Sequence, residues 1–378
     1  MSYSNKLDLS NYFIVDSSEL YESQDSHSHK YDDNSSKVRG LIFKNQEDKT
    51  LVASTFPYTE EFGVSNIDVV DTIIKEGTWK YFKSYEGTVI RIIHDVQDGV
   101  VKRVISTHKK LDAFESYWGS DKSYGELFKT EIERMYKSQK GEDENAFDNF
   151  LDSLYCEYNY TFLLLSNDDN KIVSSHDNKI LFIGCFDRSN HKYTTDINIS
   201  LLQFERPEEI EIKTTEDIMT YVNNVDYKDC QGLIAIRQDE FKLFKVINDT
   251  YKMKSMLRGN NSNLIYRYFF LKKNDQDMFI DYLDLFSHKK EMFLQSEYDF
   301  LELCKYVHMV YYQRHIMRSF VFVNPVFHSI LKKIHTWHLL DKKNNICTLD
   351  AVVRHVGDCD SKTLFYLLKE MKNNPIVF

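Results

Sequence analysis

Short runs of β-branched and aromatic residues, separated by turn signals, fill the first two thirds of the chain. The runs alternate apolar and polar positions or stay apolar for about four to eight residues, which is typical of strands. They read VRGLIFK, TLVAST, GTVIRIIH, GVVKRVIST, YTFLLLS, ILFIGCF, GLIAIR and FKLFKVI. Helical spacing appears between them in VVDTIIKEG, SYGELFKTEIERMYKSQ and NAFDNFLDSLYCEY. Strands interrupted by helices, with a hairpin around DVQDG, predict an α+β fold with antiparallel sheets.

The pattern becomes helical after about Gly259. Apolar residues then recur at helical spacing in EYDFLELCKYVHMVYYQRHIMRSF, NPVFHSILKKIHTWHLL, TLDAVVRHV and SKTLFYLLKEM. Thr348 and Ser361 stand where helix N-caps are expected. The polar stretch 22–37 indicates a loop. We therefore predict a partly flexible N-terminal segment at 1–37, a domain at 38–258 and an all-helical domain at 259–378.

Composition allows a large folded core. The chain has 378 residues, enough for two or three domains, and 42% of them are hydrophobic. The formal net charge of −10 argues against a protein coated with nucleic acid, although a local basic groove remains compatible with it. The six cysteines are scattered without a CxxC pair, which favours reduced thiols. With no signal core and no long apolar run, we expect a cytoplasmic protein without a membrane span.

Several short motifs follow one another in a suggestive order. Arg39-Gly40 enters a strand, and Ala53-Ser54-x-x-Pro57 ends the next one. Lys83-Ser-Tyr-Glu86-Gly87 precedes a strand, followed by KKLDA and FLLLSNDDNKIV. The chain continues with DCQGLIAI and FKLFKVINDTYK, which ends at residue 252. No motif is specific alone, so the ordered set carries the signal.

This set resembles the covalent nucleotidyltransferase superfamily, and most closely the phage-type RNA ligases of the first ligase family. The resemblance covers about 39–252 and implies an antiparallel-sheet, ATP-grasp-like ligase domain before a helical domain. It implies that a lysine amine attacks the α-phosphate of ATP, that AMP passes to an RNA 5′-phosphate, and that a 3′-hydroxyl displaces AMP. ATP and Mg²⁺ or Mn²⁺ are the implied cofactors, and single-stranded RNA ends are the implied partner.

The resemblance places the nucleophile near Lys83. The family lysine lies three residues before the glycine, but Lys83 lies four before Gly87, and Ser84 occupies the family position. A one-residue slip reverses the face of a strand, so Lys83 needs a bulge or looser loop to serve. Lys110 in KKLDA is the second candidate, and the absence of any nucleophile is the third. By the same resemblance, Arg39 faces the triphosphate, and Glu86 and Gly87 match the acid-glycine pair.

The remaining matches are mixed at the most chemical positions. The family glutamates fall on Leu163 and on Gln231, which leaves the metal ligands unknown. Glutamine can orient a water or ribose, but it brings no negative charge to a metal. Lys245 fits one family lysine, and Lys242 is the substitute for the other, which falls on an isoleucine. The chain is thus a divergent branch drawing ligands from Glu86, Asp168, Asp169 or Asp229, or it has lost catalysis.

Two basic clusters are candidate RNA contacts. One runs from 242 to 273, with eight basic residues against a single acid, and it includes Lys252, Lys254 and Arg258. The other contains Lys109 and Lys110. Aromatic residues interleave with the first cluster, as a stacking surface for single strands requires; they are Tyr251, Tyr266, Tyr268, Phe269 and Phe270. The alternative interpretation is a solvated face above core aromatics.

Three functional hypotheses follow. The first is an ATP-dependent RNA ligase-like nucleotidyltransferase, and the second is a non-catalytic relative that binds RNA or nucleotide. A capping guanylyltransferase or DNA ligase is less favoured, because the helical pattern stands where a β-barrel is needed. His335 and His338 lie one helical turn apart, but the sequence offers no third metal ligand with compatible spacing. The AT-biased composition is compatible with a viral origin, and the oligomeric state is left open.

Overall fold

The computed structural model describes residues 5–15, 40–45, 47, 49–57, 59–166, 171–173, 177–237, 239 and 241–373. The chain divides into two compact units, unit 1 at Met1–Met253 and unit 2 at Lys254–Phe378. The boundary falls inside helix α6 (Asp249–Arg258), earlier than the predicted boundary after residue 258. The polar stretch 22–37 and Arg39 lie outside the described residues.

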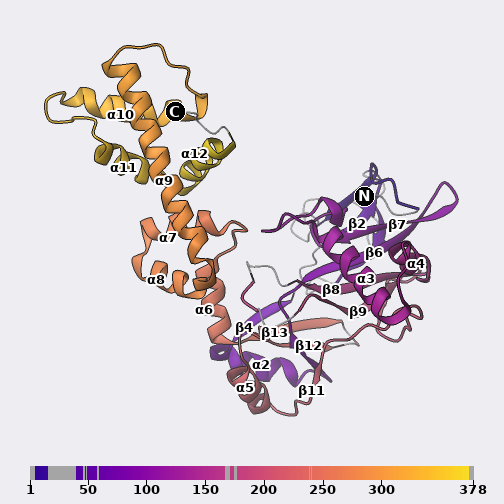
Figure 1. Ribbon diagram of the computed structural model, residues 1–378. Coiled ribbons are helices and arrows are strands. Elements are labelled where there is room, and N and C mark those ends of the chain that lie inside the picture. The colour runs from indigo at the N-terminus through magenta and orange to yellow at the C-terminus, as the bar shows by residue number, and fades with distance from the viewer. Residues whose placement is uncertain are drawn as a thin grey trace. The chain divides into compact units, whose positions relative to one another are not determined.

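Unit 1 contains two five-stranded sheets (Figure 1). The first has the order β10-β9-β8-β6-β7 and is antiparallel throughout. Its strands are β6 (Thr88–Gln97), β7 (Val100–Thr107), β8 (Tyr158–Leu165), β9 (Lys179–Asp187) and β10 (Tyr193–Thr194). One face packs against helices α3 (Tyr124–Lys140) and α4 (Ala146–Asp152) through an aromatic-rich core.

The second sheet has the order β11-β5-β12-β13-β4. Its strands are β4 (Glu60–Gly63), β5 (Lys80–Ser84), β11 (Glu209–Ile210), β12 (Gly232–Arg237) and β13 (Lys242–Ile247). All neighbours are antiparallel except β13 and β4, which run parallel. Helices α2 (Ile67–Ile74) and α5 (Thr215–Asn224) cover one face, where Tyr81, Leu233 and Phe244 are buried. Alternation along the strands sends the neighbouring residues to the other face.

A small third sheet completes the strands of unit 1. It has the order β1-β2-β3 and consists of β1 (Tyr12–Val15), β2 (Leu41–Lys44) and β3 (Thr50–Ala53). Its apolar residues Ile42, Val52 and Ala53 pack against Ile93 and Val104 of the first sheet. The predicted strands and helical intervals of this region are therefore confirmed, and its sheets are antiparallel except for the pair β13 and β4.

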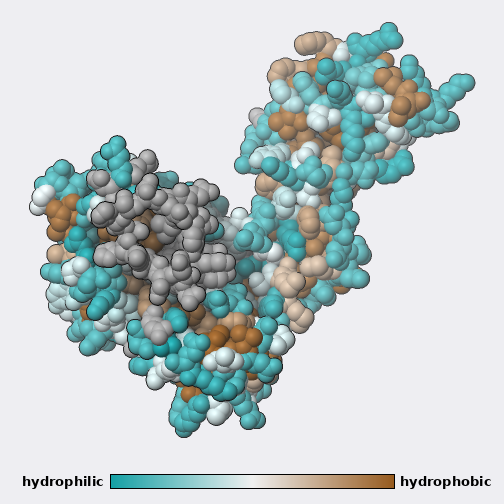
Figure 2. Space-filling model, turned by 180° about the vertical axis from the view of Figure 1, so that it is seen from behind, coloured by the Kyte–Doolittle hydropathy of each residue, from teal (hydrophilic) through white to brown (hydrophobic). Residues whose placement is uncertain are grey.

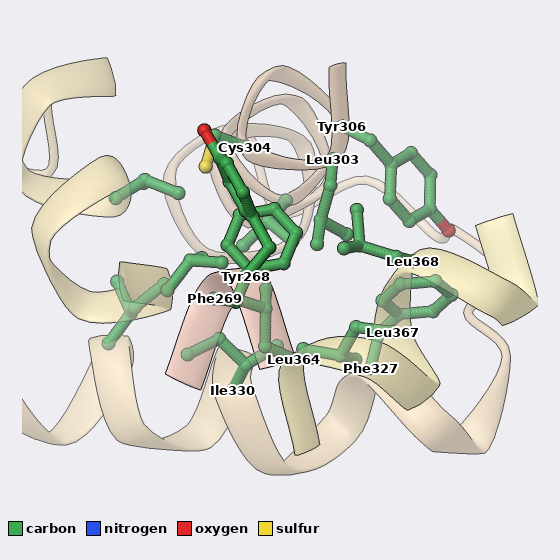
Figure 3. Close-up of a cluster of buried hydrophobic side chains, with 14 of the residues drawn as sticks. Tyr268, Phe269, Leu303, Cys304, Tyr306, Phe327, Ile330, Leu364, Leu367 and Leu368 are labelled. Atoms are coloured by element: carbon green, nitrogen blue, oxygen red, sulfur yellow. The ribbon is translucent and has the colours of Figure 1, made fainter. Parts of the chain in front are cut away.

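Unit 2 is helical over its described residues, as predicted (Figure 1). After α6 come α7 (Leu264–Asn274), α8 (Gln276–Leu285), α9 (Lys290–Tyr311), α10 (His328–Leu340), α11 (Leu349–Gly357) and α12 (Ser361–Asn373). The long helix α9 supplies Leu303, Cys304 and Tyr306 to the core, where they meet residues of α7, α10 and α12 (Figure 3). A π-helical turn, Tyr312–Ile316, extends α9.

Two details of the sequence analysis change. Tyr251, Tyr268 and Phe269 are at most 6% exposed, so the expected stacking surface among residues 242–273 loses these rings to the cores. Their helical spacing places them on buried faces, which is the alternative interpretation. Among the helices that the structure describes, none has the length and apolar composition needed to cross a bilayer.

Candidate functional site

A cavity of about 930 Å³ lies between the two five-stranded sheets of unit 1. The sheet of β5, β12 and β13 contributes side chains such as Phe82, Ser84, Ile234 and Lys245. The opposite wall comes from β6, β8, β9 and β10, and includes Leu163. The helices of each sheet cover its outer face, so the inner faces are left to form the walls. A cavity of this size is in the range that takes a nucleotide-sized ligand.

Lys245, Gln231 and Ser84 form a hydrogen-bonded group in this cavity. The Lys245 amine donates to Gln231 Oε1 at 3.2 Å, and the Ser84 hydroxyl donates to the same oxygen at 3.2 Å. The Gln231 Nε2 donates to the Tyr251 hydroxyl at 2.8 Å, which fixes the orientation of the amide. The group thus joins β5 and β13 through the residue that precedes β12.

Burial lowers the pKa of the Lys245 amine below that of an exposed lysine. The negative charges of Glu61 and Glu86 act in the opposite direction, because they stabilise the protonated amine and raise its pKa. Glu61 is brought to Lys245 by the parallel pairing of β4 with β13, in which the two residues are direct partners. A sheltered lysine of this kind can hold a phosphate or act as a nucleophile when neutral.

The backbone around Gln231 is fixed by its neighbours. The Gln231 N–H donates to the Ser84 carbonyl at 2.8 Å, and its carbonyl accepts from Asn248 N–H at 2.9 Å. Gly232 follows with φ +139°, and a Cβ there would lie 2.3 Å from the Val246 carbonyl oxygen. Only glycine fits this close approach, so the Gln-Gly pair has a structural reason apart from any chemistry.

Lys83, the predicted nucleophile, is on the other face of β5. It pairs with Leu233, and strand β5 is regular from Lys80 to Ser84, so Lys83 shares a face with the buried Tyr81. Its amine lies 3.9 Å from Glu208 and over the ring of Tyr85 at 5.8 Å. The side chain contributes to the cavity lining and is 20% exposed. The bulge that Lys83 needs is not present in β5, and Ser84 takes the inward position beside Lys245.

Glu86 and Gly87 lie in the connection between the sheets. One Glu86 oxygen accepts the backbone N–H groups of Ile172 and Val173 at 2.9 and 3.0 Å. This carboxylate therefore fastens the 171–173 segment to the connection. A Cβ at Gly87 would lie 2.8 Å from atoms of Leu163, so the glycine allows β6 to approach β8 closely.

Of the acidic residues considered as metal ligands, the structure describes Glu86 and Asp229. Leu163 lines the cavity as an apolar side chain, and Asp168 and Asp169 lie outside the described residues. Asp229 is in the turn before Gln231, where its N–H donates to the Asp226 carbonyl. Within the described ranges, no group of three or more His, Cys, Asp or Glu side chains is arranged to hold a metal ion.

The remaining predicted basic residues lie on exposed surfaces or at element ends. Lys242 alternates away from Lys245 and is exposed, and the cavity lining does not include it. Its role in place of the family lysine that falls on Ile247 stays a prediction. Lys109 and Lys110 are exposed in a turn beside the cavity residue His108, where the Thr107 hydroxyl accepts both of their N–H groups. Lys252 belongs to unit 1, and Lys254 and Arg258 belong to unit 2.

Sequence reasoning missed several residues that line the cavity. Basic side chains come from Lys80, His108 and Arg206, and aromatic rings come from Phe56, Phe182 and Tyr193. Lys80 and Phe82 share the face of Ser84, so alternation along KYFKS contained a signal for them. Glu61 had no local signal, because only the pairing of distant strands brings it to Lys245.

His315 lies beside the predicted pair His335 and His338 in unit 2. The rings of His315 and His335 stack with centroids 3.9 Å apart, and His335 Nδ1 lies 3.2 Å from the Tyr311 hydroxyl. His338 Nδ1 lies 2.7 Å from the Asn345 carbonyl oxygen. These three histidines are not arranged to hold a metal ion, as is true of every such group in the part of the chain that the structure describes.

Comparisons with known proteins were made for the whole chain. No family model matches it. It is 27% identical over 333 residues to "Immediate-early protein ICP-46 homolog" of Invertebrate iridescent virus 6, covering 82% of this chain and 70% of the relative. The homologue of the same name in Invertebrate iridescent virus 3 is 26% identical over 257 residues, with 66% and 53% covered. These names state no biochemical activity.

Solved structures matched by the chain include an RNA ligase of Naegleria gruberi. The ligase with PPi gives a TM-score of 0.37 at 12% identity, covering 63% of this chain and 66% of that one. A mutant of the ligase with ATP and Mn gives 0.35 at 12% identity, covering 53% and 58%. At scores this low the likeness carries no argument about the fold or chemistry of this chain.

Proposed function

We propose that unit 1 is a ligase-like nucleotide-binding domain that takes ATP into the cavity between its two sheets. The observation that carries the proposal is the half-buried Lys245 amine, held by Gln231 in a cavity of nucleotide size. Phe56, Phe182 and Tyr193 offer aromatic surfaces for a base, and Lys80, Arg206 and Lys245 offer positive charge for phosphates. The ordered motifs from Arg39 to Lys245 support the choice of ATP.

RNA is the proposed macromolecular partner, and a viral protein acting in the host cytoplasm is the proposed setting. The resemblance to RNA ligases supports RNA ends as the target, and the two viral relatives support the origin. Binding without end joining is favoured over ligation. Ser84 replaces the family lysine, Lys83 is on the other face of β5 from Ser84, and Leu163 and Gln231 bring no negative charge.

The divalent metal of the ligases does not fit a dedicated site in the described residues, since the acids there do not cluster. Mg²⁺ commonly binds through one or two carboxylates together with substrate phosphates. We therefore assign Mg²⁺ or Mn²⁺ no residues of this chain and derive no reaction step from it.

Nucleotide binding can be tested with a fluorescent ATP analogue on the full chain. Lys245→Ala is expected to weaken binding about tenfold to hundredfold, the range for losing a hydrogen bond to a charged group. Lys242→Ala is the matched control, because Lys242 is exposed on the same strand and does not line the cavity, and it should change affinity less than about twofold. Equal affinities for wild type and Lys245→Ala would contradict the proposal.

A second candidate function is nucleotidyl transfer, favoured by the lowered pKa of Lys245. In that reaction the neutral amine forms a bond to the α-phosphorus of ATP, the bond from this phosphorus to the bridging oxygen breaks, and pyrophosphate leaves. The amine loses a proton to solvent. An oxygen of the RNA 5′-phosphate then attacks the same phosphorus, and the bond from this phosphorus to the lysine nitrogen breaks. A 3′-hydroxyl finally attacks the RNA 5′-phosphate, loses its proton to solvent and displaces AMP. Glu86 has no proton-transfer step here, since its carboxylate holds backbone N–H groups.

Acid-resistant label from α-labelled ATP, with Mg²⁺ or Mn²⁺, separates the two functions. Label that is lost in Lys245→Ala and kept in Lys83→Ala identifies Lys245 as the nucleophile. Label that is lost only in Lys83→Ala returns the nucleophile to Lys83, and loss in Lys110→Ala moves it to that residue. Binding of the analogue without label leaves the non-catalytic function.

A further inference from the structure

A segment of unit 2 that forms neither helix nor strand, residues 317–324, holds two aromatic rings in solvent. Phe320 is 97% exposed and Phe322 is 83% exposed, the highest values among the large hydrophobic residues that the structure describes. The residues between and after them point inward, since Val321 packs against the core and Val323 is 5% exposed. This in-and-out alternation is that of a strand edge. We call residues 317–324 the Phe320 segment.

The segment is fixed at both ends. At its start, Met317 N–H donates to the Tyr312 carbonyl and Ser319 N–H donates to the Gln313 carbonyl, at 3.0 and 2.9 Å. At its end, Asn324 Nδ2 donates to Glu370 Oε1 at 2.6 Å, which ties it to α12. The two rings are therefore presented by an anchored backbone. Exposed apolar side chains that are held in place in this way commonly mark an interaction site.

The surrounding sequence has an unusual charge. Residues 303–340 contain no Asp or Glu, although the chain as a whole carries a net charge of −10. The stretch contains five basic residues, which are Lys305, Arg314, Arg318, Lys332 and Lys333. Arg314 and Arg318 flank the start of the segment and are exposed, and neither makes a salt bridge within the described parts of the chain. Tyr312 and Met317 are also exposed beside them.

We propose that the Phe320 segment, with Arg314 and Arg318, binds single-stranded RNA by stacking unpaired bases on Phe320 and Phe322. Rings on alternate residues of an extended chain face the same side, and sheet-based RNA-binding domains stack two or three bases on such rings. The arginines contact phosphates and stack on bases through their planar guanidinium groups. Figure 2 shows hydrophobic side chains reaching the surface of unit 2 among hydrophilic ones.

The choice of RNA rests on the proposed function, and the position of the site does not. The residues 242–273 were the expected stacking surface, but Tyr251, Tyr268 and Phe269 are buried. The Phe320 segment instead combines exposed rings with a stretch of sequence, residues 303–340, that contains no Asp or Glu, and Glu370 of α12 meets it at Asn324. A polyanion with aromatic bases matches both properties.

The test measures fluorescence anisotropy of a labelled single-stranded oligouridine RNA with the full chain. Phe320→Ala/Phe322→Ala is expected to weaken binding by about tenfold or more, since stacking contributes strongly for each base. Leu339→Ala/Leu340→Ala removes other exposed apolar side chains of unit 2 and should change affinity less than about twofold. Arg314→Gln/Arg318→Gln should lower the salt slope of log affinity by about 1.4, from two phosphate contacts at roughly 0.7 each.

Two further probes decide between stacking and other uses of the surface. The wild type should bind an abasic strand of the same length more weakly than it binds the RNA. The wild type and the phenylalanine variant should bind the abasic strand with equal affinity. Equal binding of both strands to the wild type would overturn the proposal. So would a variant that keeps RNA affinity but loses binding to vesicles of phosphatidylserine and phosphatidylcholine, because the segment would then be a lipid contact.

Thermal unfolding of unit 2 checks that the phenylalanine variant folds, and the proposed function is checked with the fluorescent ATP analogue. The phenylalanine variant should bind it like wild type. If it does not, cross-linking of 4-thiouridine RNA to the wild type decides, with the expected adduct on the peptide containing Phe320 and Phe322, and an adduct elsewhere overturns the site. RNA binding through this peptide without ATP binding would keep this inference and contradict the proposed function.

Discussion

The two units of the chain place their polar and apolar groups in opposite ways. Unit 1 keeps Lys245, Gln231 and Ser84 inside, between sheets whose outer faces are covered by helices. Unit 2 fills its interior with aromatic and aliphatic residues and leaves Phe320 and Phe322 outside. The difference teaches that an exposed ring and a half-buried amine are both exceptions to ordinary burial, and each marks a candidate site.

The largest expected effect tests whether the stability of unit 2 is independent of nucleotide binding by unit 1. Leu303 is fully buried in α9, so Leu303→Ala should lower the free energy of unfolding of unit 2 by about 2–5 kcal/mol. Leu301→Ala in the same helix is the control, because Leu301 is 46% exposed. Thermal unfolding measures both. Loss of binding of the ATP analogue under conditions where only unit 2 has unfolded would contradict the separation of the two roles.

A pH effect should separate the interior of unit 1 from exposed histidines. Burial lowers the pKa of His94 to about 4, while the unfolded chain takes up this proton near pH 6.5. Stability from neutral His94 is thus complete above about pH 6.5 and is lost as pH falls to about 4. The loss amounts to about 3 kcal/mol, from roughly 2.5 units at 1.36 kcal/mol each.

Urea unfolding of unit 1 as a function of pH measures this loss. His94→Asn should flatten the stability between pH 6.5 and 4, although the variant is less stable at pH 7 because His94 Nδ1 lies 2.8 Å from the Tyr158 carbonyl oxygen. His328→Asn, at an exposed position, should leave the curve unchanged. The same pH slope in wild type and His94→Asn would assign it to other groups.

A smaller effect is expected inside the cavity. Gln231→Glu is nearly isosteric and puts a carboxylate 3.2 Å from the Lys245 amine. The new charge should raise the pKa of Lys245, hold the amine in an ion pair, and repel the phosphates of ATP. We expect about tenfold weaker binding of the ATP analogue. Gln295→Glu, on the exposed surface of unit 2, is the control, and unchanged or tighter binding by Gln231→Glu would argue against phosphate contact at Lys245.

The smallest effect concerns a helix end in unit 2. Asp360 accepts the Thr363 N–H at 2.9 Å, so it caps α12, and Ser361 is the first residue of the helix. Asp360→Ala should reduce stability by about 0.5–2 kcal/mol, whereas Ser361→Ala should change it little. Thermal unfolding of the two variants compares them. A larger loss in Ser361→Ala would restore the cap predicted from sequence.

Residue patterns predicted the elements better than they predicted the site. Thr348 caps α11 as expected, because a cap depends on neighbours within one turn. The cap of α12 was wrong by one residue for the same local reason, since Asp360 and Ser361 are both good caps. The spacing of Lys83 to Gly87 predicted that Lys83 would need a bulge to replace the family lysine. Strand β5 is regular, so Ser84 and not Lys83 takes that face of the strand.

Other features lay beyond any local pattern. Glu61 meets Lys245 through strands far apart in the chain, and Glu86 holds the backbone of residues 172 and 173. The aromatic residues of 242–273 were predicted to be on the surface because basic residues are interleaved with them in the sequence. Packing buries three of them. Phe320 and Phe322 are exposed instead, and only the structure of the segment that holds them shows that their rings point outward.

The parallel pairing of β4 with β13 also has a consequence for biosynthesis. The strand that carries Glu61 leaves the ribosome early, but its partner strand emerges only after residue 247 has been made. Until then β12 has no partner on one side, and the cavity lacks the part of its wall that β13 supplies. Unit 2, built from neighbouring helices, can form as it emerges, while a sheet closed by such distant strands folds slowly. A ribosome-bound chain that ends before β13 is therefore expected to be unable to capture nucleotide.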